Sequence, residues 1–358
     1  MTVNAHIPAP ACALPGAPSP FKATGRTLRW GVVATGGIAA KVTADLALLE
    51  DSTLHAVSSR DAGRAQAFAR RHGFERSYHD DDGVPGYQHL VNDPAVDIVY
   101  VAAPHGQHFE IARSALAGGK HVLCEKAFTV NAHEAEALIK LARTKGVFLM
   151  EAMWTRFLPS VNRVWEIIRS GEIGDVKWVH ADLGFPAPAD PSSRLWDPVA
   201  GGGALLDLTV YPLTWAIGAL GMPSSATAIG ALNDDGVDVQ NAIGLTFPSG
   251  AQAQLTSSLV SACPSVAVIS GTKGWIRSGS PLHSPRELTV QQVHGQTRTE
   301  RFELAGAGYT YELRETTRCI QSGLLESPTM PLEDSLDVMR VLDGVRAQLG
   351  IRYANDVR

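Results

Sequence analysis

The sequence contains few cysteines, and those it has are scattered. Its four cysteines, Cys12, Cys124, Cys263 and Cys319, lie far apart and form no C-x-x-C pair. This spacing argues against both a zinc site and a disulfide framework. We therefore expect a reducing, cytoplasmic environment and catalysis without a bound metal.

Long hydrophobic runs and an excess of positive charge are also missing. The longest apolar candidate, Leu205 to Leu220, is interrupted by Asp207 and Pro212, and a membrane helix needs about 18 or more uninterrupted apolar residues. Lysine and arginine number 31 against 36 aspartates and glutamates, a net charge of −5. Neither a membrane nor a nucleic acid is therefore an expected partner.

The remaining composition is that of an ordinary globular protein. A content of 45% hydrophobic and 19% charged residues is too apolar for extended disorder. At about one domain per 150 residues, the 358 residues predict two domains. We place a dinucleotide-binding domain at 28–150 and a second α/β domain at 151–358.

The first 27 residues form a separate, proline-rich arm without the apolar core of a signal peptide. Five prolines between Pro8 and Pro20 exclude a helix. Two interpretations remain open: a solvated tail, or an extended arm that lies across a neighbouring subunit.

Strands and helices alternate from Leu28 to Met150. Strands are expected at 28–33, 54–58, 97–103, 121–124 and 147–150. Helices are expected from after the turn at 34–40 to about residue 50, and at 62–72, 107–117 and 132–144. This alternation predicts a doubly wound parallel sheet, whose ligand lies at the carboxyl ends of the strands.

Strands dominate the second half of the chain. After a helix at 158–170, strands are expected at 176–183, 227–232, 241–247, 251–259, 266–270, 287–293 and 298–304, followed by helices at 311–322 and 335–350. Pro248-Ser249-Gly250 is typical of a hairpin turn. We predict one large, mostly antiparallel, open-faced sheet.

The first strand leads into a glycine turn that is typical of a dinucleotide site. The G-x-G-x-x-G pattern appears as Ala34-x-Gly36-x-x-Ala39, with only the central glycine kept. Its position between the first strand and the first helix favours pyrophosphate binding at the helix N-terminus.

The end of the second strand favours NADP over NAD. Ser59 and Arg60 stand where an acidic residue would bind the ribose of NAD, and Arg64 follows on the next helix. A hydroxyl and a guanidinium suit the 2′-phosphate of NADP.

Three polar residues are candidates for the chemistry. Glu125-Lys126 follows a buried strand, and the run Gly201-Gly-Gly precedes Asp207 and Tyr211. Asp207 and Tyr211 share a face if this segment is helical. Pro212 also suits the first turn of a helix, which would leave both residues before it.

Together these motifs and Pro104-x-x-x-His108 resemble the Gfo/Idh/MocA oxidoreductase family from about Leu28 to Arg352. The segments 151–159 and 326–331 are similar to the dimeric dihydrodiol dehydrogenase branch and its NADP-dependent D-xylose dehydrogenase relatives. The family's usual Glu-Lys-Pro and histidine base are replaced here by Ala127 and Tyr211.

The resemblance implies a Rossmann domain, a second domain whose sheet forms homodimers or dimers of dimers, and NADP as cofactor. It implies, with the motifs above, cofactor contacts from Thr35, Gly36, Gly37, Ile38, Ser59, Arg60, Arg64, Pro104, His105, His108, Glu125, Lys126, Trp154 and Arg156. Expected substrate contacts are Phe185, Arg194 and Trp196.

The expected reaction is hydride transfer between NADP and a carbinol carbon of an aldose, such as D-xylose or D-glucose, or of a trans-cyclic diol. We expect Tyr211 to exchange the proton with the substrate hydroxyl. Lys126 is expected to lower the pKa of Tyr211 and to orient the substrate oxygen, and Asp207 to fix either Lys126 or another hydroxyl. Two alternatives remain: a non-catalytic dinucleotide sensor of the same fold, and a sugar–sugar oxidoreductase with tightly held NADP.

Overall fold

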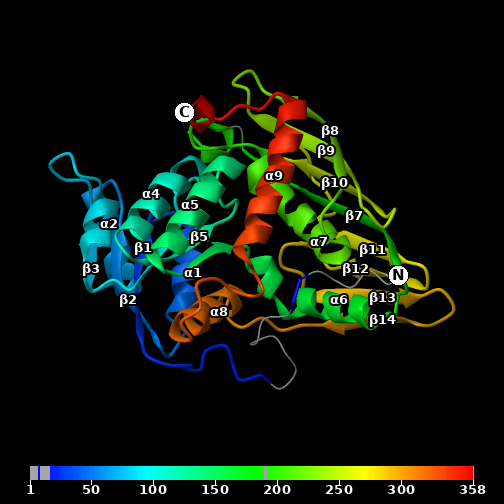
Figure 1. The fold of residues 1–358 in the computed structure, drawn as a ribbon, viewed down its shortest axis with the longest axis horizontal. Coiled ribbons are helices and arrows are strands. Elements are labelled where there is room, and N and C mark those ends of the chain that lie inside the picture. Colours follow the sequence, from blue (N-terminus) through cyan, green and yellow to red (C-terminus); the bar gives the residue numbers. More distant parts are fainter. Residues whose placement is uncertain (1–6, 9–16, 189, 191, 358) are drawn as a thin grey trace.

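Two sheets lie side by side in the computed structural model, which describes residues 7–8, 17–188, 190 and 192–357 (Figure 1). The first sheet is built from the N-terminal half of the chain and the second from the C-terminal half. Cys12 and most of the predicted N-terminal arm lie outside the described residues.

The first sheet has six parallel strands in the order β3-β2-β1-β4-β5-β6. The strands are β1 (Leu28–Val33), β2 (Ser52–Ser58), β3 (Arg76–Tyr78), β4 (Ile98–Val101), β5 (His121–Glu125) and β6 (Leu149–Ala152). The connecting helices are α1 (Gly37–Leu46), α2 (Ala62–His72), α3 (Gly86–Asn92), α4 (His105–Ala117) and α5 (Ala132–Lys145). This strand order is the doubly wound dinucleotide-binding arrangement, as predicted.

The second sheet has eight strands in the order β14-β13-β12-β11-β7-β10-β9-β8, and only the β7–β10 pair is parallel. The strands are β7 (Val176–Gly184), β8 (Ser225–Leu232), β9 (Asp238–Thr246), β10 (Gln252–Ser258), β11 (Ala267–Gly271), β12 (Gly274–Ser278), β13 (Glu287–Gln292) and β14 (Thr297–Arg301). The predicted, mostly antiparallel sheet is confirmed. Helices α6 (Pro159–Arg169) and α7 (Val210–Leu220) pack on one of its faces.

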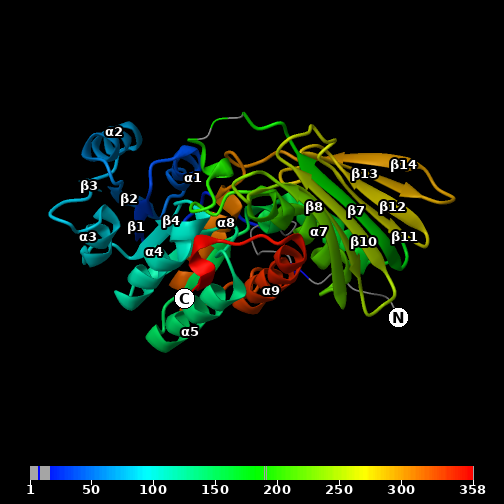
Figure 2. The ribbon, with the colours of Figure 1, turned by 90° about the horizontal axis from the view of Figure 1, so that it is seen from above.

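The last two helices join the two halves. Helix α8 (Thr310–Gln321) packs against α1, while α9 (Leu332–Leu349) contacts both α5 and β8 (Figure 2). Short helical turns complete the list of elements: η2 (Trp154–Phe157), η3 (Arg194–Trp196), η4 (Leu205–Thr209) and η5 (Ala354–Val357). Because α8 and α9, near the end of the chain, pack against helices of the first sheet, the predicted domain boundary at residue 150 stays a prediction.

Strands β3 and β12 and helix α3 were not predicted from the sequence. Strand β3 has only three residues, so it shows no periodicity, and β12 is a short strand that begins at a glycine. Helix α3 has seven residues and begins after Pro85. None of the described helices combines the length and the apolar character needed to cross a membrane.

The described part of the N-terminal arm packs on its own chain. Arg314 on α8 donates hydrogen bonds to the carbonyl oxygens of Pro20 (2.8 Å) and Phe21 (3.4 Å). Ile7 is fully buried, and its carbonyl oxygen accepts a hydrogen bond from Arg169 at 3.0 Å. A solvated tail therefore does not describe these residues, and an arm across a neighbouring subunit stays a prediction for the others.

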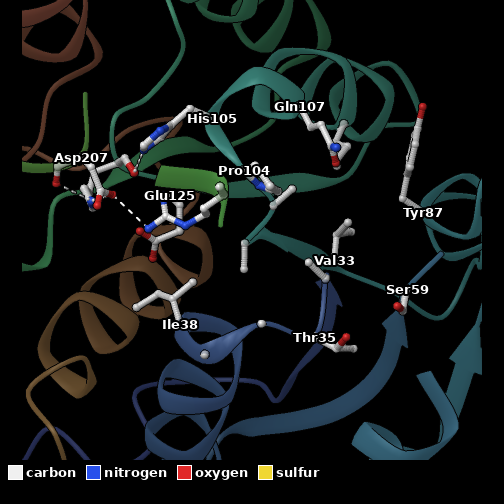
Figure 3. A pocket seen from close by; sticks show the side chains of 18 of the residues that line it. Val33, Thr35, Ile38, Ser59, Tyr87, Pro104, His105, Gln107, Glu125 and Asp207 are labelled. Atoms are coloured by element: carbon white, nitrogen blue, oxygen red, sulfur yellow. Dashed lines mark hydrogen bonds and ion pairs between the residues drawn. The ribbon is translucent and has the colours of Figure 1, made fainter. Parts of the chain in front are cut away.

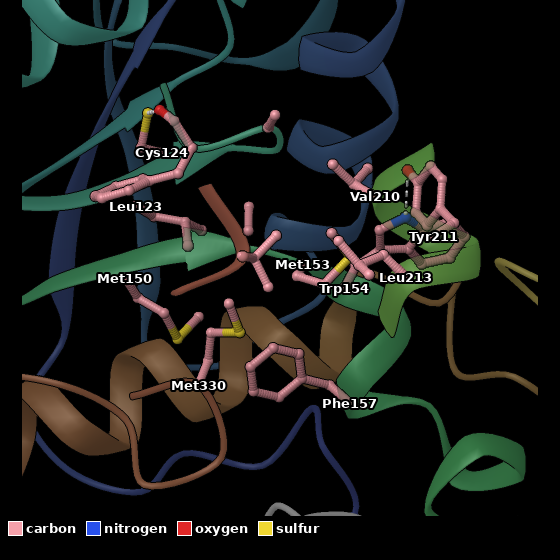
Figure 4. Packing of buried hydrophobic residues seen from close by; sticks show 14 of the residues in the cluster. Leu123, Cys124, Met150, Met153, Trp154, Phe157, Val210, Tyr211, Leu213 and Met330 are labelled. Atoms are coloured by element: carbon pink, nitrogen blue, oxygen red, sulfur yellow. Dashed lines mark hydrogen bonds between the residues drawn. The ribbon is translucent and has the colours of Figure 1, made fainter. Parts of the chain in front are cut away.

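A continuous apolar cluster runs from β5 towards α7 and ends at Trp154 and Tyr211 (Figure 4). Met150, Phe157 and Met330 form its middle and are at most 2% exposed. Full burial of such a side chain contributes about 1.5–3 kcal/mol to stability. The cluster therefore packs against the rings of Trp154 and Tyr211 and holds them in place.

Candidate active site

A cleft lies at the carboxyl ends of β1, β2, β4 and β5, where the strand order of the first sheet reverses between β1 and β4 (Figure 3). Open α/β sheets bind their ligands at this point. The wall of the cleft is completed by residues of η4, α7 and the second sheet, among them Asp207, Tyr211 and Leu183. The cleft therefore lies between the two sheets.

One end of the cleft is the glycine turn after β1. Ala34 adopts φ 83°, a left-handed conformation that favours glycine, at the position of the motif's first glycine. Gly36 precedes α1, and no side chain caps this helix. A Cβ atom on Gly36 or Gly37 would meet no atom within 4 Å. The first N–H groups of α1 thus remain available, and the residues fit the pyrophosphate of a dinucleotide.

The second strand ends at the far side of the same cleft. Ser59, Arg60 and Arg64 all line it, together with Asp80 and Tyr87. The Asp61 side chain accepts the N–H of Arg64 at 2.7 Å and so caps α2. Because it caps α2, Asp61 lies at the helix terminus. The guanidinium groups of Arg60 and Arg64 are the cations of this wall of the cleft.

Lys126 stands at the other end of the cleft in a three-member ionic cluster. Its Nζ atom donates to Asp207 Oδ1 at 3.2 Å and to the Asp207 carbonyl oxygen at 3.0 Å. Arg194 Nη2 donates to the same Oδ1 at 3.0 Å. Burial favours the neutral amine, but the Asp207 carboxylate outweighs it and raises the pKa of Lys126 to about 12. Lys126 is therefore a permanent cation.

Burial also disfavours the charged form of Asp207, but the attraction of the two neighbouring cations outweighs the effect of burial. Lys126 and Arg194 hold the pKa of this carboxyl well below its ordinary value of 3.8. Asp207 is therefore a carboxylate throughout the physiological range, paired with Lys126 at 3.2 Å.

Asp207 and Tyr211 lie in one continuous helical segment formed by η4 and α7. Residues 205–209 are a π-helical turn, in which the partner of the Asp207 carbonyl would be the N–H of residue 212. Residue 212 is proline and has no N–H, and Lys126 donates to this carbonyl. Pro212 thus lies inside the helical segment and does not begin it.

Tyr211 lies beside the ionic cluster, with its ring centroid 5.1 Å from Lys126 Nζ. Trp154 Nε1 donates a hydrogen bond to its hydroxyl at 3.3 Å (Figure 4). Burial raises the pKa of Tyr211 above its ordinary value of 10, although Lys126 acts in the opposite direction. The effect of Lys126 on this pKa therefore has the expected direction, but burial outweighs it, and the phenol is protonated at neutral pH.

Glu125, the other half of the Glu-Lys pair, faces the cleft but is tied to the first sheet. Tyr100 on β4 donates to Glu125 Oε1 at 2.5 Å. Burial raises the pKa of this carboxyl, and the Tyr100 hydrogen bond and Lys126 oppose the rise. The peptide bond between Lys126 and Ala127 is cis.

Two histidines hold the loops around Lys126. His105 lines the cleft, and its ring nitrogens lie 2.9 Å from the Gly201 carbonyl oxygen and 3.2 Å from that of Lys126. His108 is fully buried and contacts the carbonyl oxygens of Ala103 at 2.8 Å and Ala127 at 3.0 Å. His108 therefore supports the loop from behind and does not line the cleft, contrary to expectation.

Three other predicted residues also lie outside the cleft lining. Arg156 is buried against Asp334 at 2.7 Å and has no face on the cleft, so its expected cofactor contact is wrong. Trp196 donates to the Pro188 carbonyl oxygen at 2.8 Å. Trp154 acts one step away, through its hydrogen bond to Tyr211.

The other predicted residues of the cleft are brought together. The lining contains Thr35, Gly36, Gly37, Ile38, Ser59, Arg60, Arg64, Pro104, His105, Glu125, Lys126, Phe185, Arg194, Asp207 and Tyr211. Sequence reasoning missed Asp80, Tyr87, Gln107, Ile111, Leu183, Leu208 and His283. These residues belong to no motif, and His283 comes from a distant part of the chain.

Comparison with known proteins agrees with this geometry over most of the chain. Residues 28–153 match the model "Oxidoreductase family, NAD-binding Rossmann fold", and residues 161–277 match the "GFO/IDH/MocA C-terminal domain". The chain belongs to the Gfo/Idh/MocA oxidoreductase family. It is an oxidoreductase that acts on CH–OH groups with a nicotinamide dinucleotide.

Curated relatives of similar length include trans-1,2-dihydrobenzene-1,2-diol dehydrogenases. The Sus scrofa protein is 35% identical over 339 residues, which cover 92% of this chain and 99% of that protein. The Homo sapiens protein is 33% identical over 345 residues with the same coverage. The predicted branch of the family is thereby confirmed.

Solved structures share the fold. A 3-ketoreductase from Actinomadura kijaniata, in complex with NADP, has a TM-score of 0.79 at 28% identity, covering 92% of this chain and 99% of its own. A levoglucosan dehydrogenase in complex with NADH and levoglucosan has a TM-score of 0.82 at 21% identity, covering 91% and 98%. The neighbours thus include complexes with both nicotinamide cofactors.

Proposed function

We propose that this chain is an NADP-dependent dehydrogenase or reductase of vicinal trans-diols on a ring, or of aldoses. The observation that carries the proposal is the Lys126–Asp207 ion pair beside Tyr211, at the carboxyl ends of the strands of a dinucleotide-binding sheet. A purely nucleotide-sensing protein needs no such group of proton-handling residues beside its cofactor cleft.

The phosphates of NADP would be held by the N-terminus of α1 at Gly36 and Gly37, and its 2′-phosphate by Ser59, Arg60 and Arg64. When bound, NADP supplies the acceptor or donor of a hydride. The proposed preference for NADP over NAD rests on two features of this wall of the cleft. The guanidinium groups of Arg60 and Arg64 line it, and no acidic residue directly follows β2.

Tyr211 exchanges the substrate's hydroxyl proton in this proposal. Because its phenol is protonated at neutral pH, it is ready to donate a proton to a carbonyl oxygen in the reduction direction. Oxidation requires the phenolate, so its rate rises with pH. Lys126 stabilises the phenolate and the developing charge on the substrate oxygen.

Substrate selection is assigned to the walls around this polar end. Leu183 and Phe185 supply apolar surface, and Arg194 adds a donor whose other contact is Asp207. An apolar wall with a few convergent polar groups suits a ring that carries hydroxyls. The names of the diol dehydrogenase relatives support this substrate class.

Assembly and location remain further parts of the proposal. Helices α6 and α7 pack on one face of the eight-stranded sheet, and no other described helix covers the opposite face. We assign that face to a homodimer or dimer of dimers in the cytoplasm. Light scattering after size exclusion tests the assembly.

The proposed activity is tested by the absorbance of reduced nicotinamide. NADP and NAD are each supplied with trans-cyclic diols, D-xylose, D-glucose and other aldoses, using wild type and Tyr211→Phe. We expect turnover that prefers NADP and is lost in the variant. NADPH binding without turnover of any substrate would overturn the proposal in favour of a sensor.

A further inference from the structure

The imidazole of His283 lies in the cleft wall next to Tyr211. Its ring centroid is 5.2 Å from that of Tyr211 and 5.9 Å from that of Trp154. Of the described residues that follow α7, only His283 is among those lining the cleft. The second sheet therefore contributes one polar group to the reacting end of the site.

The segment that carries His283 is anchored to the core on both sides. The carbonyl oxygen of His283 accepts a hydrogen bond from Thr155 Oγ1 at 2.7 Å. The carbonyl oxygen of Leu282, which is fully buried, accepts one from Trp215 Nε1 at 3.1 Å. Two residues further on, the Pro285 carbonyl oxygen accepts one from Ser160 Oγ at 2.7 Å. The backbone at His283 is therefore held in one position.

The side chain, in contrast, has an unused hydrogen-bonding group. Nδ1 of His283 is buried and has no hydrogen-bond partner among the described residues. Buried polar atoms of native proteins nearly always have a partner, because an unsatisfied one loses its hydration without compensation. The same ring is partly exposed and lines the cleft, so a ligand bound there can contact the imidazole.

The imidazole is also uncharged under physiological conditions. Burial lowers the pKa of His283 to about 4, and the nearby cations Lys126 and Lys41 act in the same direction. A neutral imidazole has one donor and one acceptor nitrogen, so it bonds a hydroxyl without attracting a charged group. The wall of the cleft here is suited to a neutral, hydroxylated ligand.

We propose that His283 is a specificity-determining residue, whose imidazole binds the substrate hydroxyl next to the reacting carbon. This inference rests on the proposed function, in which the reacting hydroxyl contacts Tyr211 and Lys126. The neighbouring hydroxyl of a vicinal diol is on the adjacent carbon, within reach of a ring that lies beside Tyr211. The enzyme then selects vicinal diols and polyols over compounds with a single hydroxyl.

The test compares two substrates that differ only in the second hydroxyl. The pair is trans-cyclohexane-1,2-diol with cyclohexanol, or an aldose with its 2-deoxy analogue, according to which class is turned over. In His283→Phe we expect the ratio of kcat/KM values, hydroxylated over deoxy compound, to fall by roughly 10- to 100-fold. His283→Asn keeps polar atoms near the position of Nδ1 and should restore part of the ratio.

A matched control is His294→Phe, because His294 is exposed on the hairpin that follows β13. It should leave the ratio at the wild-type value. Circular dichroism and NADPH fluorescence show whether each variant is folded and binds cofactor; if His283→Phe does not fold, His283→Asn alone gives the comparison. If kcat/KM falls equally for both substrates, or for neither, the ratio is unchanged. This result refutes the role of His283 and leaves the proposed function standing. Wild-type protein that turns over neither pair refutes the proposed function, and this inference with it.

Discussion

Replacing Lys126 by methionine tests the electrostatic part of the proposed mechanism. The substitution keeps the approximate shape of the side chain and removes its charge. Asp207 retains its contact with Arg194 at 3.0 Å, so its carboxylate keeps a cationic partner. The variant therefore isolates the effect of one cation on Tyr211.

The magnitude follows from the distance between the two groups. Nζ of Lys126 lies 5.1 Å from the centroid of the Tyr211 ring. With an effective dielectric constant of about 20, Coulomb's law gives an attraction of about 3 kcal/mol between ammonium and phenolate. This corresponds to a factor of roughly 100 in the fraction of phenolate, and hence in the rate of oxidation.

The assay is the initial rate of nicotinamide reduction between pH 7 and pH 9, with the best diol or aldose. Because burial raises the pKa of Tyr211 above 10, kcat/KM for oxidation should rise about tenfold per pH unit in wild type. Lys126→Met should give a parallel line about two logarithmic units lower. Tyr211→Phe should lose the slope.

Two results would refute this reasoning. A Lys126→Met variant with oxidation rates within a few-fold of wild type would show that the cation does not stabilise the phenolate. A flat pH profile in wild type would show that Tyr211 is not the group that loses the proton. Lys126→Arg is the control, since it keeps the charge but not the geometry.

Three further predictions concern the cofactor end and the stability of the fold. Gly36→Val should weaken NADPH binding at least about tenfold, because the side chain fills the space in front of α1. Thermal unfolding should change little, because a Cβ atom at this position meets no other atom. An unchanged NADPH affinity in a fluorescence titration would place the phosphates elsewhere. The double change Arg60→Ala and Arg64→Ala should raise the Kd for NADPH by about tenfold or more and leave that for NADH nearly unchanged; an equal loss for both cofactors would contradict the assignment. Asp51→Ala should lower the free energy of unfolding by about 3–5 kcal/mol, because it removes the carboxylate that pairs with the buried Arg314 guanidinium at 2.7 Å and leaves that charge uncompensated. Burial opposes the charge of Asp51, yet Arg314 lowers the pKa of this carboxyl to about 2. The stabilisation by the ion pair is therefore present above the ordinary pKa of 3.8 and is lost as the pH falls towards 2. Urea unfolding in which wild type shows no such loss relative to Asp51→Ala would refute this prediction.

Apart from the three-residue strand β3, the sequence alone determined the strands of the first sheet and the location of its ligand site. Alternating strand and helix patterns specify a parallel sheet, and the carboxyl end of each strand then has a known place. Gly36, Arg60 and Lys126 each lie within three residues of the end of a strand, so local order along the chain was enough to bring them to one edge.

Tertiary structure decided the partners that come from far along the chain. Lys126 and Asp207 are 81 residues apart, and His283 comes from beyond the next five strands of the second sheet. Arg156 also follows a strand of the first sheet closely, four residues after the end of β6, yet it turns away from the cleft to Asp334. No periodicity encodes such choices, because they depend on how the second sheet and the last helices pack against the first.

The protonation state of Tyr211 was also decided in three dimensions. The sequence correctly suggested a cation beside this residue, and Lys126 does favour its phenolate. Burial outweighs that effect, however, and burial is a sum over every surrounding group rather than a property of one neighbour. The sequence thus named the pair, and only the packing around it decided which proton state prevails.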